Sequence, residues 1–402
     1  MTRHDPFVSG QYAEAGAEWI DAVHERIIAL IDRFGLQLDP HATTWTAVRR
    51  WLHRDGELLG PDDLRRVDPL LGPGLQRFED HLASIAAGIV DPADPLSHPE
   101  AARYDAQSIA EFVDSLDLSE LTRLFVTRNM QGEFAAEPRE VSVLFVAQQR
   151  AVYERAAARH GHVEACRLLG GVSAIADGLA AALPPGTVRL DRAVSAVVSS
   201  ADSVTVKTAT ERFDADVVVL ATALAGLRDV VFEPPLPDAL RDAITGLGYG
   251  TVTKTALQYP SRAWPAGYAT TAGFAQRVYE PTADVGGDDP ILMAYTGGDG
   301  GRELGSVEPS ERLRIIEAGE REMYSELPPA LGGFSQAWSA EPRFRGSYAV
   351  YRPGEIGRFW DVLRRPHGRI HLAGEHTATW TGYLEGAVES GESVAARVLQ
   401  SR

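Results

Sequence analysis

The spacing of apolar residues divides the chain into a mainly helical part and a later part rich in strands. After a short extended entry, the apolar residues from Trp19 to Ile31 follow helical spacing, and Gly35 is the predicted end of that helix. From about Thr44 to Gly161 the pattern is again mostly helical, broken by turns that contain proline and glycine. We therefore predict a helical lobe over this range.

The pattern changes at Leu168, where LLGGVSAIADGLAAALPPG predicts a helix between a glycine pair and Pro-Pro-Gly. Residues 187–213 alternate as strands, and the nearly continuous apolar run DADVVVLATAL fits a strand buried on both faces of a parallel or mixed sheet. A second β-rich stretch spans residues 251–298 and precedes the helix SERLRIIEAGEREMYSEL. The last segment predicts a short strand, Arg369–Ala373, a loop, and a helix from about Gly382 onward. The fold class that this order predicts is α/β.

Length, charge and cysteine content narrow the class of protein. A chain of 402 residues suggests two domains or two interleaved lobes. The formal net charge of −17 argues against nucleic acid as a partner and weakly favours cationic small molecules. No apolar stretch approaches the roughly 20 residues that span a bilayer, and the first residues contain no signal-peptide core. Cys166 is the only cysteine, which excludes an intrachain disulfide and fits a cytoplasmic protein.

The C-terminal segment has the residues best suited to bind a cofactor. The predicted strand leads into Gly374 and Glu375, and the last helix begins near Gly382 and Tyr383. Unpaired backbone N–H groups at a helix N-terminus suit an anion or the carbonyl edge of a ring, and Gly374 permits close backbone approach. The alternative is an ordinary helix cap with a surface glutamate. The local pattern alone leaves both interpretations open.

A resemblance across most of the chain favours the cofactor-binding interpretation of this segment. The string AGEHTATWTGYLEGAVESG resembles the closing signature of the flavin-containing amine oxidases, the family of monoamine, polyamine and L-amino-acid oxidases. Four further blocks are similar to family segments in the same order. They are GQYAEAGAEWIDAVHERIIALIDRFGL, LLGGVSAIADGLAAAL with the later RAVSAVV and ADVVVLAT, GYGTVTKTALQYPSRAW, and RGSYAVYRPG. Five ordered blocks predict the two-lobed fold of an FAD-dependent amine oxidase.

The resemblance assigns roles position by position. It implies contacts with the FAD diphosphate and ribose for Gly374 and Glu375, and with the adenine for the backbone of Val194. Gly16, Ala17, Trp19, Gly382, Tyr383 and Leu384 would lie along the flavin ring. Lys254 would hold a water at flavin N5, whereas Lys207, the only other lysine, fits an exposed strand position.

The predicted chemistry depends on few acid–base groups. The family resemblance makes Tyr348 and Tyr383 an aromatic pair that flanks the substrate amine. Ser347 stands where some relatives have a cysteine bonded to the flavin, so we expect non-covalent FAD. A neutral amine would lose a hydride equivalent to the flavin, and oxygen would reoxidise the flavin to give peroxide. The histidines lack metal-ligand spacing, so no metal is expected.

One family motif is missing from the sequence. Family members carry a GxGxxG loop that cradles the pyrophosphate, and the closest cluster here, Gly246, Gly248 and Gly250, lies between a predicted helix and a strand. Three explanations remain open: a separate small polypeptide supplies the βαβ unit, the true start lies upstream or the chain was clipped or mis-started, or the chain is a flavin-free pseudoenzyme with a structural or binding role. The first makes a hetero-oligomer the expected assembly, because a partner would cover an apolar sheet edge.

The resemblance also implies a division into lobes and a class of substrate. We expect an FAD-binding lobe from residues 1–40, 165–245 and 342–402, and a substrate-binding lobe from residues 41–164 and 246–341. The substrate is expected to be a small-molecule amine or amino acid. Arg123 and Arg128 are candidates for a substrate carboxylate through bidentate pairing, while Glu133 or Glu137 would suit a polyamine.

Overall fold

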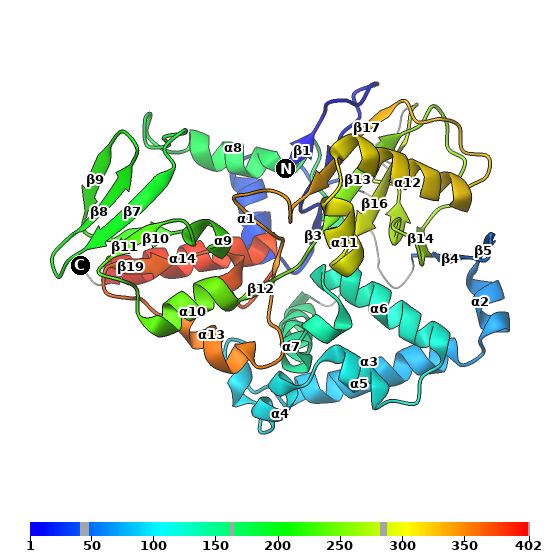
Figure 1. Cartoon of the computed structure of the whole chain (residues 1–402), viewed down its shortest axis with the longest axis horizontal. Helices are drawn as coiled ribbons and strands as arrows, with labels where there is room; N and C mark the ends of the chain where they lie inside the picture. The colour runs from blue at the N-terminus through cyan, green and yellow to red at the C-terminus, as the bar shows by residue number, and fades with distance from the viewer. Residues whose placement is uncertain (41–47, 161–164, 282–287, 401–402) are drawn as a thin grey trace.

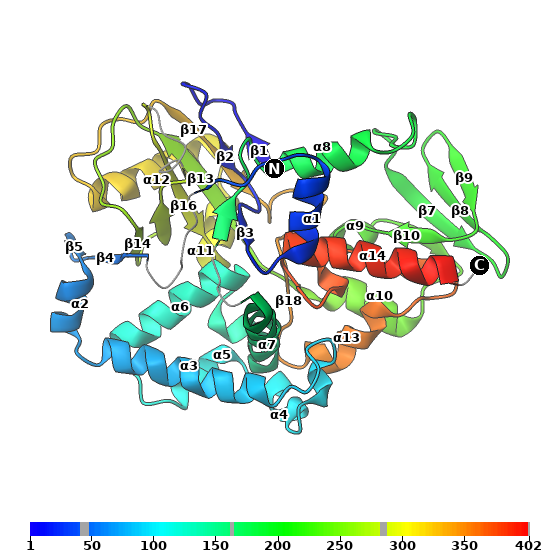
Figure 2. The same cartoon turned by 180° about the vertical axis from the view of Figure 1, so that it is seen from behind.

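A computed structural model describes residues 1–40, 48–160, 165–281 and 288–400. Two regions flank a central set of loops and are visible from both sides of the molecule (Figures 1 and 2). One contains a large sheet with two helices on its outer face and a layer of helices below it. The other contains smaller sheets around the C-terminal helix. The fold class is α/β, as predicted.

The large sheet has seven strands. Its central strands β13 and β16 are buried almost throughout, and α12 covers the outer face because Leu257, Leu292 and Ala294 pack with Ile316. The helix SERLRIIEAGEREMYSEL is confirmed as α12. In spatial order the strands are β17 (Gly332–Ala337), β13 (Thr253–Gln258), β16 (Ile291–Thr296), β15 (Arg277–Tyr279), β14 (Tyr268–Thr271), β4 (Arg50–Arg54) and β5 (Glu57–Leu59); the covering helices are α11 (Gly298–Gly305) and α12 (Pro309–Met323).

The helical layer lies below this sheet in Figure 1. Two of its helices begin at serine caps: the Ser108 side chain accepts from the Glu111 N–H, and the Ser119 side chain accepts from the Thr122 N–H. The helices are α2 (Pro61–Val67), α3 (Leu71–Ala87), α4 (Ala101–Ala106), α5 (Ile109–Asp114), α6 (Glu120–Phe134) and α7 (Val143–His160), with the 3₁₀ turns η1 (Pro95–Ser97) and η2 (Pro138–Glu140).

The second region is built from segments that are distant in sequence. The C-terminal helix α14 packs on α1, and β10 pairs in parallel with β19. Its helices are α1 (Glu25–Arg33), α8 (Ser173–Ala181), α9 (Leu224–Leu227), α10 (Asp238–Gly246), α13 (Glu355–Arg364) and α14 (Leu384–Gln400), with the turn η3 (Glu375–Thr377). The paired strands are β1 (Thr2–Arg3) with β2 (Ala13–Glu14), β3 (Trp19–Asp21) with β6 (Ala165–Arg167), β10 (Val218–Leu220) with β19 (Ile370–Leu372), β12 (Gly248–Tyr249) with β18 (Ala349–Val350), and β11 (Val231–Glu233), β7 (Val194–Ser199), β8 (Val204–Thr208) and β9 (Arg212–Ala215) in one sheet.

Two element predictions are wrong for reasons of tertiary pairing. Trp19–Asp21, predicted as the start of a helix, is strand β3 because it pairs with Ala165–Arg167, a segment from much later in the chain. The hairpin β4–β5 lies inside the range predicted as helical, because β4 adds to the large sheet through parallel pairing with β14. Neither partner can be found from local periodicity.

Two strand predictions in the second region also differ from the structure. Residues 187–193 form no strand in the described structure, although strand β7 follows them. The run DADVVVLATAL gives only the short strand β10, and Val219 is 43% exposed, so the prediction of burial on both faces is wrong. In the part of the chain that the structure describes, β10 pairs with β19 alone, so its other edge has no strand partner there.

Candidate active site

Lys254 lies on β13 with its side chain 4% exposed. Its Nζ donates to Glu18 Oε2 at 3.0 Å and to the Gly16 carbonyl at 3.1 Å, and Tyr279 Oη donates to the same Glu18 oxygen at 2.6 Å. A buried ammonium requires such a partner, because an isolated charge is costly away from water. The ion pair therefore connects the large sheet to the segment Gly16–Glu18.

Glu18 was not among the residues predicted from the sequence. A buried lysine in a strand requires a nearby acid, but the sequence does not reveal which of the many acids is brought to it. The structure supplies the answer through the β3–β6 pairing, which places the chain before Trp19 next to β13.

Tyr348 and Tyr383 lie together although they are on loops far apart in sequence. Gly382 has φ +88°, and a Cβ built there would lie 2.9 Å from Tyr348 Cδ2. The loop that carries Gly382 therefore crosses the loop that carries Tyr348 at a point where only glycine fits. Both tyrosine side chains are partly exposed. The structure therefore brings the two predicted tyrosines to neighbouring loops, and their role as a pair that flanks the substrate stays a prediction.

Glu375 holds these two loops together. Its Oε1 accepts from the Ala349 N–H at 3.0 Å and its Oε2 from the Gly382 N–H at 2.8 Å, next to Tyr348 and Tyr383 respectively. Burial raises the pKa of Glu375 to about 7, and the two backbone donors partly oppose that rise. The carboxyl group is thereby a brace between the tyrosine loops, in addition to any contact with a cofactor.

Glu133, at the end of α6, contacts both tyrosines. Tyr383 Oη donates to Glu133 Oε1 at 2.6 Å, and Tyr348 Oη donates to the Glu133 carbonyl. Although the rings are partly exposed, desolvation of the hydroxyl ends, with the neighbouring Glu133 charge, raises the pKa of both phenols well above the usual value, so both hydroxyls stay protonated. Tyr295 extends the group, with its Oη 3.3 Å from Tyr348 Oη.

The surroundings of Lys254 fit a flat ring. Gly16 and Ala17 border it with backbone and one methyl group, Gly16 is partly exposed and Ala17 exposed, and a Cβ on Gly16 would still lie 3.6 Å from Trp338. Tyr295, the strand partner of Lys254, connects this segment to the tyrosine pair, because its Oη lies 3.3 Å from Tyr348 Oη. A planar cofactor needs such a wall without bulky side chains, so the residues present fit an isoalloxazine ring.

The other predicted cofactor residues lie at separate points of the second region. Trp19 begins β3 and stacks under the Arg167 guanidinium, 5.3 Å from the ring centre. Gly374, with φ +137°, donates its N–H to Ser390 Oγ at 2.9 Å, and Leu384 begins α14. Val194 begins β7 with its side chain 41% exposed. Their roles toward a cofactor remain predictions.

The two predicted carboxylate-binding arginines are separated along α6. Arg123 lies ten residues before Glu133, roughly 15 Å along the helix, and its guanidinium pairs with Asp114 at 2.6 Å and with loop carbonyls. Arg128 lies closer, bonded to Gln131 and to the Ala272 carbonyl, and its buried Nε has no partner in the described structure. Of the two arginines, Arg128 is therefore the one closer to Glu133 along α6.

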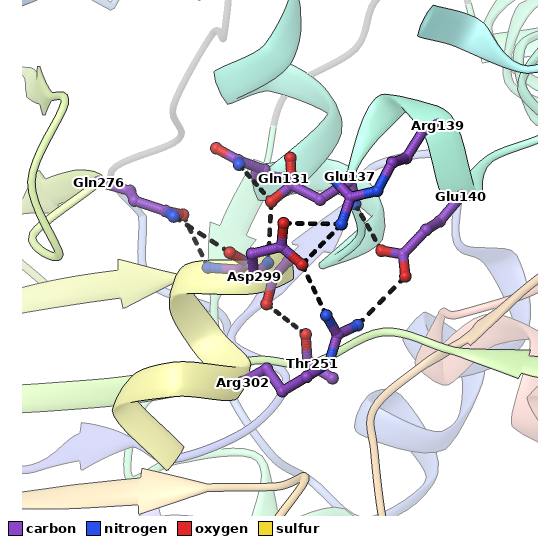
Figure 3. Close-up of polar contacts among 10 residues, drawn as sticks. Gln131, Glu137, Arg139, Glu140, Thr251, Gln276, Asp299 and Arg302 are labelled. Atoms are coloured by element: carbon purple, nitrogen blue, oxygen red, sulfur yellow. Dashed lines mark hydrogen bonds and ion pairs between the residues drawn. The ribbon is translucent and has the colours of Figure 1, made fainter. Parts of the chain in front are cut away.

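Glu137 belongs to a polar network that joins η2 to α11 (Figure 3). Its Oε1 accepts from Gln131 Nε2 at 2.7 Å and from the Asp299 N–H at 2.8 Å. Arg139 and Arg302 both pair with the Asp299 carboxylate. Glu137 Oε1 therefore already accepts two hydrogen bonds within the network. Of the two predicted acids, Glu133 is the one that contacts the tyrosines.

The described ranges contain no candidate for two other kinds of site. No group of three or more histidine, cysteine, aspartate or glutamate side chains there is arranged to hold a metal ion. No helix within those ranges combines the length and apolar character needed to cross a bilayer.

Comparisons with known proteins agree with this geometry. Residues 1–399 match the family model described as flavin containing amine oxidoreductase. The chain belongs to this family. It is 26% identical over 412 residues to a probable flavin-containing monoamine oxidase A of Dictyostelium discoideum, covering 97% of this chain and 88% of that protein. It is 29% identical over 324 residues to a flavin-containing amine oxidase of Danio rerio, covering 76% of this chain but 61% of that protein.

The fold comparison gives the same assignment at the level of architecture. The structure of cyclohexylamine oxidase from Brevibacterium oxydans superposes with a TM-score of 0.84 at 22% identity, covering 97% of this chain and 88% of that chain. The fold is therefore the two-lobed fold of FAD-dependent amine oxidases, and FAD is the cofactor of this family member.

Proposed function

We propose that this protein uses FAD to oxidise the C–N bond of an amine or amino acid to an imine. The observation that carries the proposal is that Tyr295 links the Lys254–Glu18 pair to the two tyrosine loops that Glu375 holds together. A protein that had kept only the fold would not need a buried lysine, an acid for it, and a braced tyrosine pair.

Each group has a distinct task. When bound, FAD accepts the hydride equivalent that leaves the α-carbon of the amine. The π-faces of Tyr348 and Tyr383 orient the amine, and Glu375 fixes the spacing of their loops. Glu133 attracts the substrate ammonium by its charge, and Lys254 positions a water or an oxygen molecule by its own. No protein nucleophile is required.

The reoxidation step and the mode of cofactor attachment are part of the proposal. We propose that molecular oxygen takes up the two electrons and yields hydrogen peroxide, with the Lys254 charge favouring electron transfer to oxygen. Ser347 precedes Tyr348, and its hydroxyl cannot form a thioether, so FAD is expected to be bound without a covalent link.

We further propose that a glycine-rich polypeptide binds to the FAD-binding region and holds the cofactor diphosphate. The support is a set of large apolar side chains exposed on that region, at Leu190 (78%), Val231 (56%) and Val219 (43%). Flavin retention after purification, with and without the co-expressed product encoded next to this chain, tests this point.

A peroxide-coupled screen of amines and amino acids with the FAD-supplemented protein tests the activity. We expect peroxide formation with a restricted set of amines and loss of turnover on changing Tyr383 to alanine. Absence of peroxide with every compound, in a folded protein that retains FAD, would contradict the oxidase proposal.

A further inference from the structure

The inner face of the large sheet carries a row of functional side chains. Lys254 pairs with Tyr295 on β16, and Tyr295 pairs with Arg277 on β15. Paired residues in neighbouring strands project to the same side of a sheet, so these three side chains share one face. Strands lie about 4.8 Å apart, which places the Arg277 backbone about 10 Å from that of Lys254.

The same row continues to a second arginine. Arg277 pairs with Thr270 on β14, and Tyr268, two residues earlier on that strand, pairs with Arg50 on β4. The face opposite α12 therefore runs from Lys254 at one end to Arg50 at the other. Arg128 approaches this face from α6, since Arg277 Nη2 donates to the Arg128 carbonyl at 3.5 Å.

Among the described residues, these three arginines have no acidic partner. No carboxylate in the described ranges lies within ion-pair distance of Arg50, Arg128 or Arg277; their hydrogen bonds go to Asn129, to Gln131 and to backbone carbonyls. Burial lowers the pKa of Arg50 and the nearby Arg277 charge lowers it further, while the more distant charge of Glu79 opposes this only in part. In a chain with a net charge of −17, three neighbouring arginines without an ion-pair partner require an explanation.

A negatively charged substrate group explains it. We propose that the substrate is an amino acid, with its amine between Tyr348 and Tyr383 and its carboxylate bound by Arg277 within the positive field of Arg50 and Arg128. The proposal rests on the proposed function, because it assigns the substrate class of the same site.

The position of Arg277 supports this assignment over a purely structural role. Its strand partner Tyr295 contacts Tyr348 directly, and a Cβ at Gly132 would collide with the Arg277 guanidinium. The next residue, Glu133, contacts Tyr383. An anion-binding guanidinium and a cation-binding carboxylate thus flank the tyrosine pair, which matches the two opposite charges of an amino acid.

Three matched compounds test the proposal on the FAD-supplemented protein: phenylalanine, 2-phenylethylamine without the carboxylate, and 3-phenylpropanoate without the amine. The panel of other amino acids and their decarboxylated amines is run in parallel, with anaerobic flavin reduction as the readout. We expect an amino acid to reduce the flavin with a kcat/KM at least tenfold above that of its decarboxylated amine. Equal or greater efficiency with the decarboxylated amines would overturn the proposal.

Variants identify the residue responsible. Arg277→Gln should raise the apparent dissociation constant of the amino acid roughly 10- to 100-fold, as expected for loss of a charge-assisted pair, while reduction by a decarboxylated amine changes little. Arg277→Lys should recover part of the loss, and Arg50→Gln should show a smaller effect. Arg314, an exposed residue of α12 on the opposite side of the sheet, provides the control Arg314→Gln. The same affinity for amino acids in Arg277→Gln and in wild type would contradict the assignment.

A binding measurement separates this proposal from the proposed function. Titration calorimetry with 3-phenylpropanoate should detect binding to the wild type that Arg277→Gln weakens at least tenfold. Failure of every amine and amino acid to reduce the flavin would remove the oxidation proposal, yet calorimetry would still report on the carboxylate site. No detectable heat with the wild type would overturn the carboxylate assignment.

Discussion

At the scale of single residues, the pairing of Lys254 with Glu18 is the contact on which the account of the site depends. Of the two lysines in the chain, one is exposed on β8 and the other is 4% exposed and ion-paired next to Gly16. A lysine buried at the cost of desolvation, with an acid held for it, indicates that its charge has a use.

We predict that replacing Lys254 slows reoxidation of the reduced flavin and leaves its reduction by substrate largely intact. The double variant Lys254→Met with Glu18→Gln avoids leaving a buried carboxylate unpaired, which alone would destabilise the fold. Stopped-flow mixing of reduced protein with oxygen should show a rate lower by roughly 100-fold, the scale of losing one preorganised electrostatic group.

Lys207 supplies the matched control, because Lys207→Met removes the only other lysine from an exposed position on β8. An oxygen rate in the double variant equal to that of Lys207→Met would show that Lys254 has no part in reoxidation. An equal loss in the anaerobic reduction step would instead assign Lys254 to substrate oxidation.

Only some of the site residues could be predicted from the sequence. The motif around Gly374 and Tyr383 identified the loop that meets Tyr348. Only the three-dimensional structure showed that Glu18 pairs with Lys254 and that Glu133 contacts both tyrosines. The same is true of the place of Arg277 on the inner face of the sheet. Strand register decides which side chains share a face of the sheet. A shift of one residue would move every side chain of the strand to the opposite face. No local pattern fixes the register between β15 and β16.

At the scale of elements, the packing of α12 on the large sheet buries an acid. Tyr259 Oη donates to Glu320 Oε2 at 2.6 Å, and burial raises the pKa of Glu320 to about 8. The group is therefore protonated in the folded protein at neutral pH, whereas it ionises near 4.5 in the unfolded chain.

The direction of the pH effect follows from that difference. A pKa raised by folding contributes stability that is fully present below about 4.5 and is lost as the pH rises through about 8. We predict that the free energy of unfolding falls across this window, by at most about 1.4 kcal/mol per pH unit from this group. Glu320→Gln, which keeps the hydrogen bond from Tyr259, should flatten the dependence.

Denaturant unfolding at several pH values checks this prediction. The exposed Glu322 on the same helix serves as the control, since Glu322→Gln should leave the slope of the wild type unchanged. An unaltered slope in Glu320→Gln would mean that the buried carboxyl does not titrate in this range.

Elements with strong local signals were the ones predicted well from the sequence. The helices α12 and α14 were predicted as helices, and the strands β13 and β16 lie within the stretch predicted to be rich in strands. The strands β3 and β4 were missed because their state depends on partners far along the chain.

At the scale of the whole molecule, the region of the large sheet and the second region each contribute part of the candidate active site. The large sheet provides Lys254 and the arginine row, while the second region provides Gly16, Ala17 and the loops of the tyrosine pair. The overall acidity of the chain is compatible with a locally positive site, because charges within a few ångströms dominate binding and distant ones are screened.

The measurement that tests the central claim most directly is the visible absorption spectrum of the FAD-supplemented protein under anaerobic conditions, before and after addition of amines and amino acids. We predict a bound-flavin spectrum that bleaches on addition of a substrate and returns on admission of oxygen, with one equivalent of peroxide. A folded protein that binds no flavin, or whose flavin stays oxidised with every compound, would contradict the oxidase proposal and favour a flavin-free structural or binding role.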